Sequence, residues 1–162
     1  MKIRVFVGTD WPPVQAIYQQ GIDSKNATFQ TTVKSWEAWD GSMHRQCRLV
    51  AVEGETVAGW AALSPVSSRC VYGGVAEVSV YVAAARQGRG LGKLLLTALV
   101  RESEQAGFWT LQAGIFPENI ASVRLHEKCG FRIVGLRERL GQLDGRWRDV
   151  LLLERRSAVV GV

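Results

Sequence analysis

The residues best able to do chemistry form a glycine-rich segment between a strand-like run and a long amphipathic pattern. The segment reads Gln87-Gly88-Arg89-Gly90-Leu91-Gly92, with Arg86 before it and Lys93 after it. Glycines allow a backbone to approach a ligand closely, and free N–H groups at the start of a helix attract anions. The segment therefore predicts phosphate binding. The alternative is a tight strand-to-helix turn that carries solvated arginines.

Three phosphate-binding patterns can be compared with this segment. A Walker A loop requires glycine where Gln87 stands and a Ser or Thr after Lys93, and the sequence has neither. A dinucleotide-binding fingerprint requires glycine at position 93 and an acidic residue about 20 positions later, which the run Leu111–Ile115 does not supply. The pattern Q/R-x-x-G-x-G/A is matched in full by Gln87, Gly90 and Gly92.

A single carboxylate, Glu77, interrupts an apolar strand-like run. Strand alternation places Glu77 on one face with Ser79 and Tyr81, and the opposite face is apolar. A carboxylate in such a position must be paired or lie in a polar cleft, because isolated burial of charge is costly. Glu77 is therefore either half of a structural ion pair or a general base that deprotonates an amine.

The elements that must position these residues can be read from periodicity and turn signals. We expect strands over about 2–7, 48–53, 56–63, 75–83, 110–115, 131–140 and 147–154. We expect helices over about 10–23, 33–44, 91–105 and 119–129. The order β-α-α-β-β-β-α-β-α-β-β predicts an α/β fold of the α+β type, a mixed sheet with helices on both faces, in one domain over residues 1–162.

Composition limits the classes of protein that remain. The 162 residues are 47% hydrophobic and 22% charged, which is ordinary for a globular chain with one core. The longest apolar runs are a few residues, whereas a membrane span needs about 20. Three widely spaced cysteines fit a reducing cytoplasm better than a disulfide framework or a zinc site. The net charge of +5 is compatible with nucleic acid, an anionic membrane or a phosphorylated small molecule as partner.

The glycine pattern and the element order resemble the GNAT family of N-acetyltransferases, which bind acetyl-CoA. A second block, Pro117–Phe131, is similar to that family's N-x-x-[SA]-x-x-L-[YH]-E-K-x-G-F helix. Most members have Tyr where this chain has His126, and His there is a feature of the phosphinothricin acetyltransferase-like branch. Three further segments resemble that branch, namely residues 28–31, 64–82 and 145–150.

The resemblance implies the GNAT fold with a splayed central sheet, and acetyl-CoA bound between strands 75–83 and 110–115. It implies these cofactor-binding residues: Val80, Tyr81, Val82, Gln87, Gly88, Arg89, Gly90, Leu91, Gly92, Asn119 and Ser122. Glu77 is implied as the base, and His126 as the acid for the CoA thiolate or as a partner in proton handling. The family transfers acetyl directly and no metal is expected.

The resemblance also implies a small amino acid or analogue as acceptor, such as phosphinothricin or methionine sulfoximine. Arg69 is expected to bind the acceptor's carboxylate, with Phe29 and Tyr72 as walls. Two departures fall near this expected pocket. Ser67 replaces a common Lys, and a Lys or Arg usual in the final hairpin is absent where Gln142 or Leu143 falls. The identity of the acceptor therefore stays open.

Other functions remain to be weighed. A GNAT enzyme for a polyamine or a protein N-terminus is one, and a catalytically silent acyl-CoA-binding module is another. A nucleic-acid-binding protein is disfavoured because basic residues concentrate in the glycine segment and the final hairpin instead of alternating with aromatic ones. The branch implies a homodimer, for which Trp36 and Trp39 are the candidate interface residues.

Overall fold

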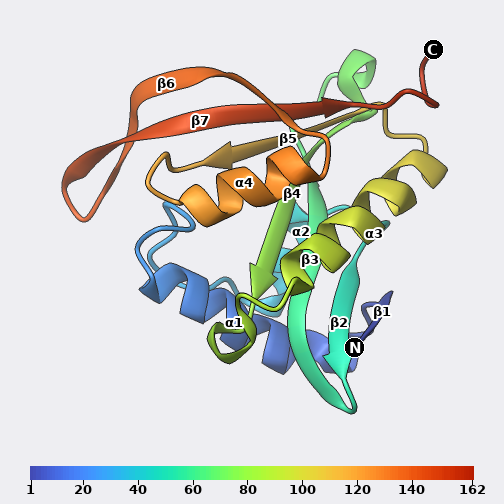
Figure 1. The fold of residues 1–162 in the computed structure, drawn as a ribbon, viewed down its shortest axis with the longest axis vertical. Coiled ribbons are helices and arrows are strands. Elements are labelled where there is room, and N and C mark those ends of the chain that lie inside the picture. Colours follow the sequence, from blue (N-terminus) through green and yellow to red (C-terminus); the bar gives the residue numbers. More distant parts are fainter.

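Seven strands form one sheet in the order β1-β2-β3-β4-β5-β7-β6 in the computed structural model, which describes residues 1–162 (Figure 1). Every neighbouring pair is antiparallel except β4 and β5, which are parallel. The predicted mixed sheet is therefore confirmed. The strands are β1 (Lys2–Val5), β2 (Leu49–Glu53), β3 (Thr56–Pro65), β4 (Val75–Val82), β5 (Thr110–Ile115), β6 (Arg132–Leu143) and β7 (Arg146–Arg156).

The helices are α1 (Trp11–Asp23), α2 (Trp36–Ser42), α3 (Leu91–Gln105) and α4 (Ile120–Lys128). Their order matches the prediction, but α2 is shorter than expected because the Ser35 side chain accepts the Ala38 N–H at 3.2 Å and starts the helix there. Asp10 occupies the position before α1 without capping it. Its carboxylate instead pairs with Arg4 at 2.7 Å, which lowers the pKa of Asp10 through the hydrogen bonds of the guanidinium.

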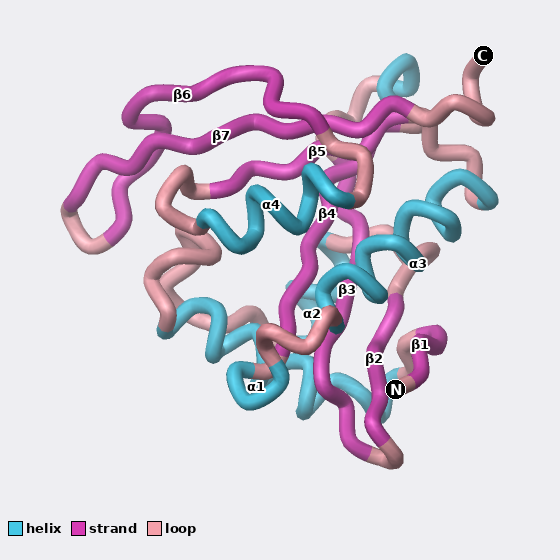
Figure 2. The backbone as a smooth tube through the Cα atoms, viewed as in Figure 1, coloured by secondary structure: helices cyan, strands magenta, loops and turns pink.

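Two separate apolar cores lie on the two faces of the sheet. On one face, α3 packs through Leu95, Leu96 and Leu99, and α4 adds partly buried Val123 and Leu125. The other face carries an aromatic core beneath α1 and α2 that contains Tyr18, Trp39 and Trp60. In Figure 2, α3 and α4 cross the near side of the sheet and α2 lies behind it. Helices on both faces were predicted and are confirmed.

The aromatic core corrects one expectation about the tryptophans. Trp39 is only 2% exposed and packs against Trp60 with ring centroids 5.7 Å apart. Trp36 stacks on Phe6 at 5.9 Å. The prediction of an interface role is wrong for Trp39, because its ring is buried inside its own chain, and it stays a prediction for Trp36, which is only partly buried.

The sheet opens between β4 and β5. These strands pair only through Val75–Glu77 of β4 and Thr110–Gln112 of β5. Beyond Glu77, β4 keeps only its other neighbour β3, while β5 continues along β7. The two strands therefore diverge after a short parallel contact, which confirms the predicted splay (Figure 1). No helix of the chain combines the length and the apolar character needed to span a membrane.

Candidate active site

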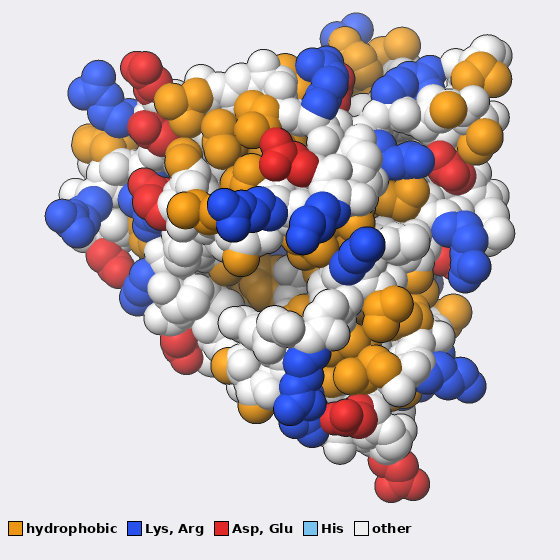
Figure 3. Space-filling model, viewed as in Figure 1, with side chains coloured by type: hydrophobic (Ala, Val, Ile, Leu, Met, Phe, Trp, Pro, Cys, Tyr) orange, Lys and Arg blue, Asp and Glu red, His pale blue; other side chains and the backbone are white.

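A cavity of about 480 Å³ lies in the gap between β4 and β5. Side chains from both faces of the sheet line it. Asn119, the cap of α4, and Ser122 and His126 within α4 line it on one face, and Lys34, Trp39 and Ser42 from the α2 region line it on the other. The cavity therefore runs through the sheet. Figure 3 shows that the near face of the molecule is hollowed close to its centre, with Lys and Arg side chains around the hollow.

The predicted phosphate loop presents a row of free backbone donors. The first hydrogen bond of α3 runs from the Leu94 N–H to the Gly90 carbonyl at 3.1 Å, and the N–H groups of residues 88–93 bond to no other backbone group. Gly88 and Gly90 have φ values of +75° and +78°, in the left-handed region that favours glycine. The loop thus has the geometry of an anion site at a helix N-terminus.

Glycine is required at position 92 for a different reason than at positions 88 and 90. A Cβ atom at this position would meet the Leu125 side chain of α4 at 3.0 Å. Gly92 therefore allows α3 and α4 to pack closely.

The charges around the loop are not equally available. Arg86 pairs with Glu53 at 2.7 Å, so part of its charge is already neutralised. Arg89 and Lys93 are exposed and form no ion pair within 4.0 Å. The Gln87 amide reaches back to the Val82 carbonyl at 3.4 Å.

The open edge of β4 presents backbone groups to the cavity. The Ala83 N–H donates to the Ala58 carbonyl on the β3 side at 2.9 Å. Because backbone groups alternate in direction along a strand, those of Val82 and Val80 face the gap. The Tyr81 ring turns instead toward α1 and stacks on Trp60 at 4.9 Å. Burial raises the pKa of the Tyr81 phenol, which therefore stays protonated.

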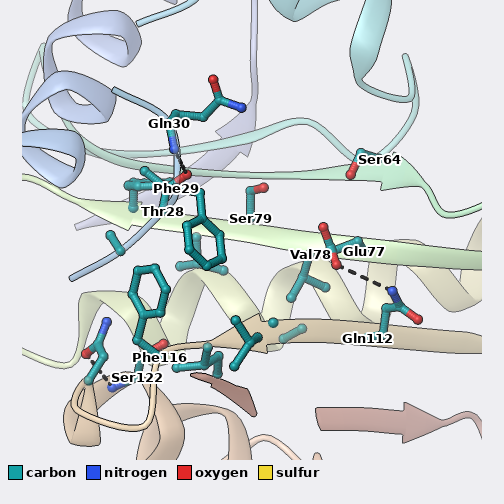
Figure 4. Close-up of a pocket in the computed structure, with 18 of the residues that line it drawn as sticks. Thr28, Phe29, Gln30, Ser64, Glu77, Val78, Ser79, Gln112, Phe116 and Ser122 are labelled. Atoms are coloured by element: carbon teal, nitrogen blue, oxygen red, sulfur yellow. Dashed lines mark hydrogen bonds between the residues drawn. The ribbon is translucent and has the colours of Figure 1, made fainter. Parts of the chain in front are cut away.

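Glu77 lies on the α1/α2 face of β4, at the point where the sheet opens. Its Oε1 accepts a hydrogen bond from the Gln112 amide of β5 at 3.4 Å (Figure 4). No Lys, Arg or His nitrogen lies within 4.0 Å of its carboxylate, so the structural ion pair considered from the sequence is absent. Ser64 is its partner across the β3–β4 pair. Glu77 is also the only acidic side chain that lines the cavity.

His126 lines the same cavity from the α3/α4 side. It is 5% exposed, and its Nδ1–H donates to the Ser122 carbonyl at 2.7 Å. Nε2 has no partner in the chain and is not among the nitrogens closed off from solvent. Burial lowers the pKa of His126, and the hydrogen bond to Ser122 only partly opposes this shift. The ring is therefore neutral at pH 7, with Nε2 as a proton acceptor.

Asn119 and Phe29 also reach the cavity. The Asn119 side chain accepts the Ser122 N–H at 3.3 Å, as expected for a helix cap, and its amide donates to the Asn26 carbonyl at 3.1 Å. Phe29 meets Phe116 edge-to-face at 4.9 Å (Figure 4). Asn119 thus joins α4 to the loop that carries Phe29.

Two predicted acceptor residues lie elsewhere. Arg69 and Tyr72 do not line the cavity, and the Arg69 guanidinium stacks over the Tyr72 ring at 5.3 Å. Tyr72 is 44% exposed. Ser67 accepts the backbone N–H of Arg69 at 3.1 Å, and Leu143 is buried against Phe116. The structure therefore does not bring the segment around Arg69 together with Glu77.

Sequence reasoning missed three polar residues of the cavity wall. Gln112 interrupts an apolar strand as Glu77 does, so the same alternation argument would have found it. Lys34 and Arg137 also line the cavity, from the segment before α2 and from β6. No local pattern marks these two, because their position depends on how distant segments pack.

Comparison with known proteins agrees with this architecture. The model of the acetyltransferase (GNAT) family matches residues 13–131. The L-methionine sulfoximine/L-methionine sulfone acetyltransferase of Pseudomonas paraeruginosa is 31% identical over 151 residues, which cover 90% of this chain and 88% of that protein.

Two solved structures share the fold over nearly their whole length. The phosphinothricin acetyltransferase of Sinorhizobium meliloti in complex with acetyl-CoA superimposes with a TM-score of 0.87 at 27% identity, covering 99% of this chain and 90% of that one. The ribosomal-protein-alanine N-acetyltransferase of Brucella melitensis superimposes with a TM-score of 0.88 at 31% identity, covering 97% and 100%.

The fold, the splayed sheet and the free loop donors define an acyl-CoA-binding acetyltransferase, and the chain belongs to the GNAT family. Within that family it is a phosphinothricin acetyltransferase-like protein. The predictions of the GNAT fold and of an acetyl-CoA-dependent N-acetyltransferase are confirmed.

Proposed function

We propose that this enzyme transfers the acetyl group of acetyl-CoA to the amine of a small amino acid or analogue, of the phosphinothricin or methionine sulfoximine type. One observation carries the proposal. One cavity, lined by the unpaired carboxylate Glu77 on one face of the sheet and by His126 on the other, lies where β4 and β5 diverge, and β4 leads on to the free N–H groups of residues 88–93 at the start of α3. The acceptor named for the Pseudomonas relative supports the substrate class.

In this proposal acetyl-CoA supplies an acetyl group already activated as a thioester. The N–H groups of residues 88–93 hold the pyrophosphate, and Arg89 and Lys93 balance its charge. Backbone groups of Val80 and Val82 hold the pantetheine arm and polarise the thioester carbonyl. This assignment uses the unpaired edge of β4, which no other strand covers.

Glu77 is proposed to take one proton from the acceptor ammonium, directly or through a water, so that the nitrogen can attack the thioester carbon. The nitrogen loses a second proton as the amide forms, and the sulfur of CoA gains one as the C–S bond breaks. His126, neutral with a free Nε2, is the group that can relay this proton on the CoA side. Because the ring is neutral, His126 is better suited to accept a proton at Nε2 and pass it to the CoA sulfur than to act as an acid that is already protonated.

The test is a screen of amino acids and amines for acetyl-CoA-dependent thiol release, with L-methionine sulfoximine, phosphinothricin, spermidine and an N-terminal alanine peptide in the panel. We expect the highest kcat/KM for the two amino-acid analogues. Turnover of the peptide alone would favour the alternative suggested by the Brucella neighbour. Binding of acetyl-CoA without turnover of any amine would favour a silent acyl-CoA-binding module.

We also propose that the enzyme is a homodimer that works in the cytoplasm. The edge strand β6 and its partner β7 carry exposed apolar side chains that a second copy could cover: Ile133, Val134, Leu136, Leu140 and Trp147. The unpaired cysteines suit a reducing compartment. Light scattering should give twice the chain mass of 17.9 kDa, and a monomer at micromolar concentration would contradict the dimer.

A further inference from the structure

The pairing of the last two strands is interrupted beside the cavity. Strand β6 has three residues, 138–140, where its partner β7 has only one, Asp149. Extra residues of this kind form a β-bulge, which bends a strand and redirects its side chains, often next to an active site. Residues 138–140 are called the β6 bulge below.

The centre of the β6 bulge has an unfavourable backbone conformation. Arg139 has a φ value of +45°, in the left-handed region that residues with a Cβ atom rarely adopt. Its N–H donates to Oδ1 of the Asp149 carboxylate at 2.8 Å. Such conformations persist only where the surrounding structure holds them, and they gather at functional sites. Asp149 is therefore the residue that holds the β6 bulge.

The β6 bulge forms part of the cavity wall. Leu140 lines the cavity, and so does Arg137, which precedes the bulge. In an uninterrupted strand, residues three apart lie on opposite faces, so the bulge allows both to reach one wall. Gly141, the next residue of β6, lies against the Phe29 ring, which a Cβ atom at Gly141 would meet at 3.1 Å. Phe29 lines the same cavity (Figure 4).

The Asp149 carboxylate has no other role in the structure. It does not line the cavity, and no Lys, Arg or His nitrogen lies within 4.0 Å of it. Its only side-chain hydrogen bond is the one from the Arg139 N–H. Asp149 can therefore act on the cavity only through the backbone of β6.

We propose that Asp149 is a positioning residue that holds the β6 bulge so that Leu140 limits the length of the acceptor side chain. Asp149 does not touch the acceptor in this proposal, whereas Leu140 contacts the end of its side chain. The inference rests on the proposed acetyl transfer, since it requires the acceptor to bind in the cavity that Glu77 lines. It gives the β6–β7 hairpin a part in acceptor selectivity.

The first kinetic test compares L-methionine sulfone with L-ethionine sulfone, which is longer by one methylene. Wild type should favour the shorter sulfone by about tenfold in kcat/KM, the lower end of what one methylene costs in a closed apolar pocket. Leu140→Ala should remove most of this preference, because it makes room for the extra methylene. Leu136→Ala is the control, since Leu136 is an exposed leucine of β6 that does not line the cavity.

The second kinetic test addresses Asp149. Asp149→Ala should weaken the preference as Leu140→Ala does, through the acceptor KM, with kcat and the acetyl-CoA KM near wild type. Asp149→Asn should keep the preference, because its amide oxygen also accepts the Arg139 N–H. Adding Arg139→Gly to Asp149→Ala should restore part of it, because glycine adopts a positive φ without support. Glu138→Ala, which removes an exposed carboxylate of the same bulge, is the control.

Three kinetic results would overturn the inference. They are an unchanged preference in Leu140→Ala or Asp149→Ala, an equal loss of kcat/KM for both sulfones in Asp149→Ala, and a double variant with Arg139→Gly that is no more selective than Asp149→Ala alone. Each of these leaves the acetyl transfer itself intact, so failure of the inference is distinguishable from failure of the proposed function.

A binding test does not depend on turnover. In protein labelled with ¹³C at the leucine methyls and saturated with CoA, L-methionine sulfone should shift the Leu140 methyl resonances, assigned with Leu140→Ala. The shift should be smaller in Asp149→Ala. Shifts in an enzyme that acetylates neither sulfone would support the inference and reject the proposed reaction. Unmoved Leu140 resonances at saturating sulfone, or equal shifts in Asp149→Ala, would overturn the inference.

Discussion

The two ends of the proposed binding site are built in opposite ways. The proposed CoA end is a contiguous segment, residues 88–93, which lies outside the cavity wall and has free backbone N–H groups at the start of α3. The acceptor end is made of side chains from segments far apart in the sequence, including Phe29, Lys34, Glu77 and Gln112. A backbone site tolerates changes of side chain but depends on φ, whereas a side-chain site depends on residue type and on how loops are held.

This difference predicts that a single substitution will affect either acetyl-CoA or the acceptor, but not both. Changes at the loop should affect acetyl-CoA and leave the acceptor alone, and changes on the α1/α2 face should do the reverse. A variant that weakens both would show that the two ends are coupled through the splayed strands.

The largest effect is expected for Glu77→Gln. Removing the base should lower kcat by about 10²- to 10⁴-fold, while calorimetry should give an acetyl-CoA Kd close to that of wild type. Glu55→Gln, at an exposed position in the β2–β3 turn, is the matched control and should keep full activity. Unchanged turnover in Glu77→Gln would remove Glu77 from the role of base.

The next effect is expected at the loop. Gly90→Ala should destabilise the fold by about 1–2 kcal/mol, since φ at Gly90 is +78°, and should weaken acetyl-CoA binding by roughly tenfold as loop donors move. Gly54→Ala imposes the same strain at φ +62° in a hairpin turn. Urea unfolding should show similar losses in both variants. Equal acetyl-CoA affinity in the two would contradict a backbone phosphate site.

A smaller effect is expected from Arg148, which holds the acceptor end together from β7. Its guanidinium donates to the Lys25 carbonyl at 3.0 Å and to the Asn26 side chain at 3.4 Å, and it lies over the Phe116 ring at 4.0 Å. Arg148→Met should raise the acceptor KM by about 3- to 10-fold through loosened loops, with the acetyl-CoA KM unchanged.

Arg132→Met provides the comparison for Arg148. Arg132 is an exposed arginine of β6 that pairs with Glu154 at 2.6 Å and does not line the cavity, so its loss should leave both KM values as they are. A rise in the acetyl-CoA KM of Arg148→Met would break the separation of the two ends.

The smallest effect is a pH dependence of stability. Burial lowers the pKa of His126 in the folded protein, while the unfolded chain titrates near 6.5. Below 6.5 the unfolded state therefore binds more protons, and the free energy of unfolding falls as pH falls until the folded pKa is passed. His126→Gln should make the fall in the free energy of unfolding between pH 7 and pH 5.5 smaller, by less than about 1 kcal/mol. Part of the slope should remain, because burial also lowers the pKa of His44.

The features that could be predicted from the sequence are those that depend on contiguous residues. α3 and β5 have the bounds that were expected, since their signals are local: Gly90 and Gly107 flank the helix, and alternation marks the strand. Glu77 and His126 were proposed from local pattern and family resemblance, and both line the cavity. Ser35 as the cap of α2 was not identified, and the helix was expected to be longer.

The acceptor end could not be predicted because it depends on packing between distant segments. Arg69 has the right chemistry for a carboxylate but stacks on Tyr72 outside the cavity, whereas Lys34 carries no sequence signal and reaches it. Trp39 was likewise predicted at an interface between subunits, but the aromatic core buries it inside the chain.

The central claim is that the two substrates meet across the splay of β4 and β5 from opposite faces of the sheet. The most direct measurement is a crystal structure of the enzyme with CoA and the N-acetylated sulfone bound together. We expect pyrophosphate oxygens on the N–H groups of residues 88–93 and the amide nitrogen of the product near the Glu77 carboxylate. A product bound on the α3/α4 face, or CoA bound away from the start of α3, would contradict it.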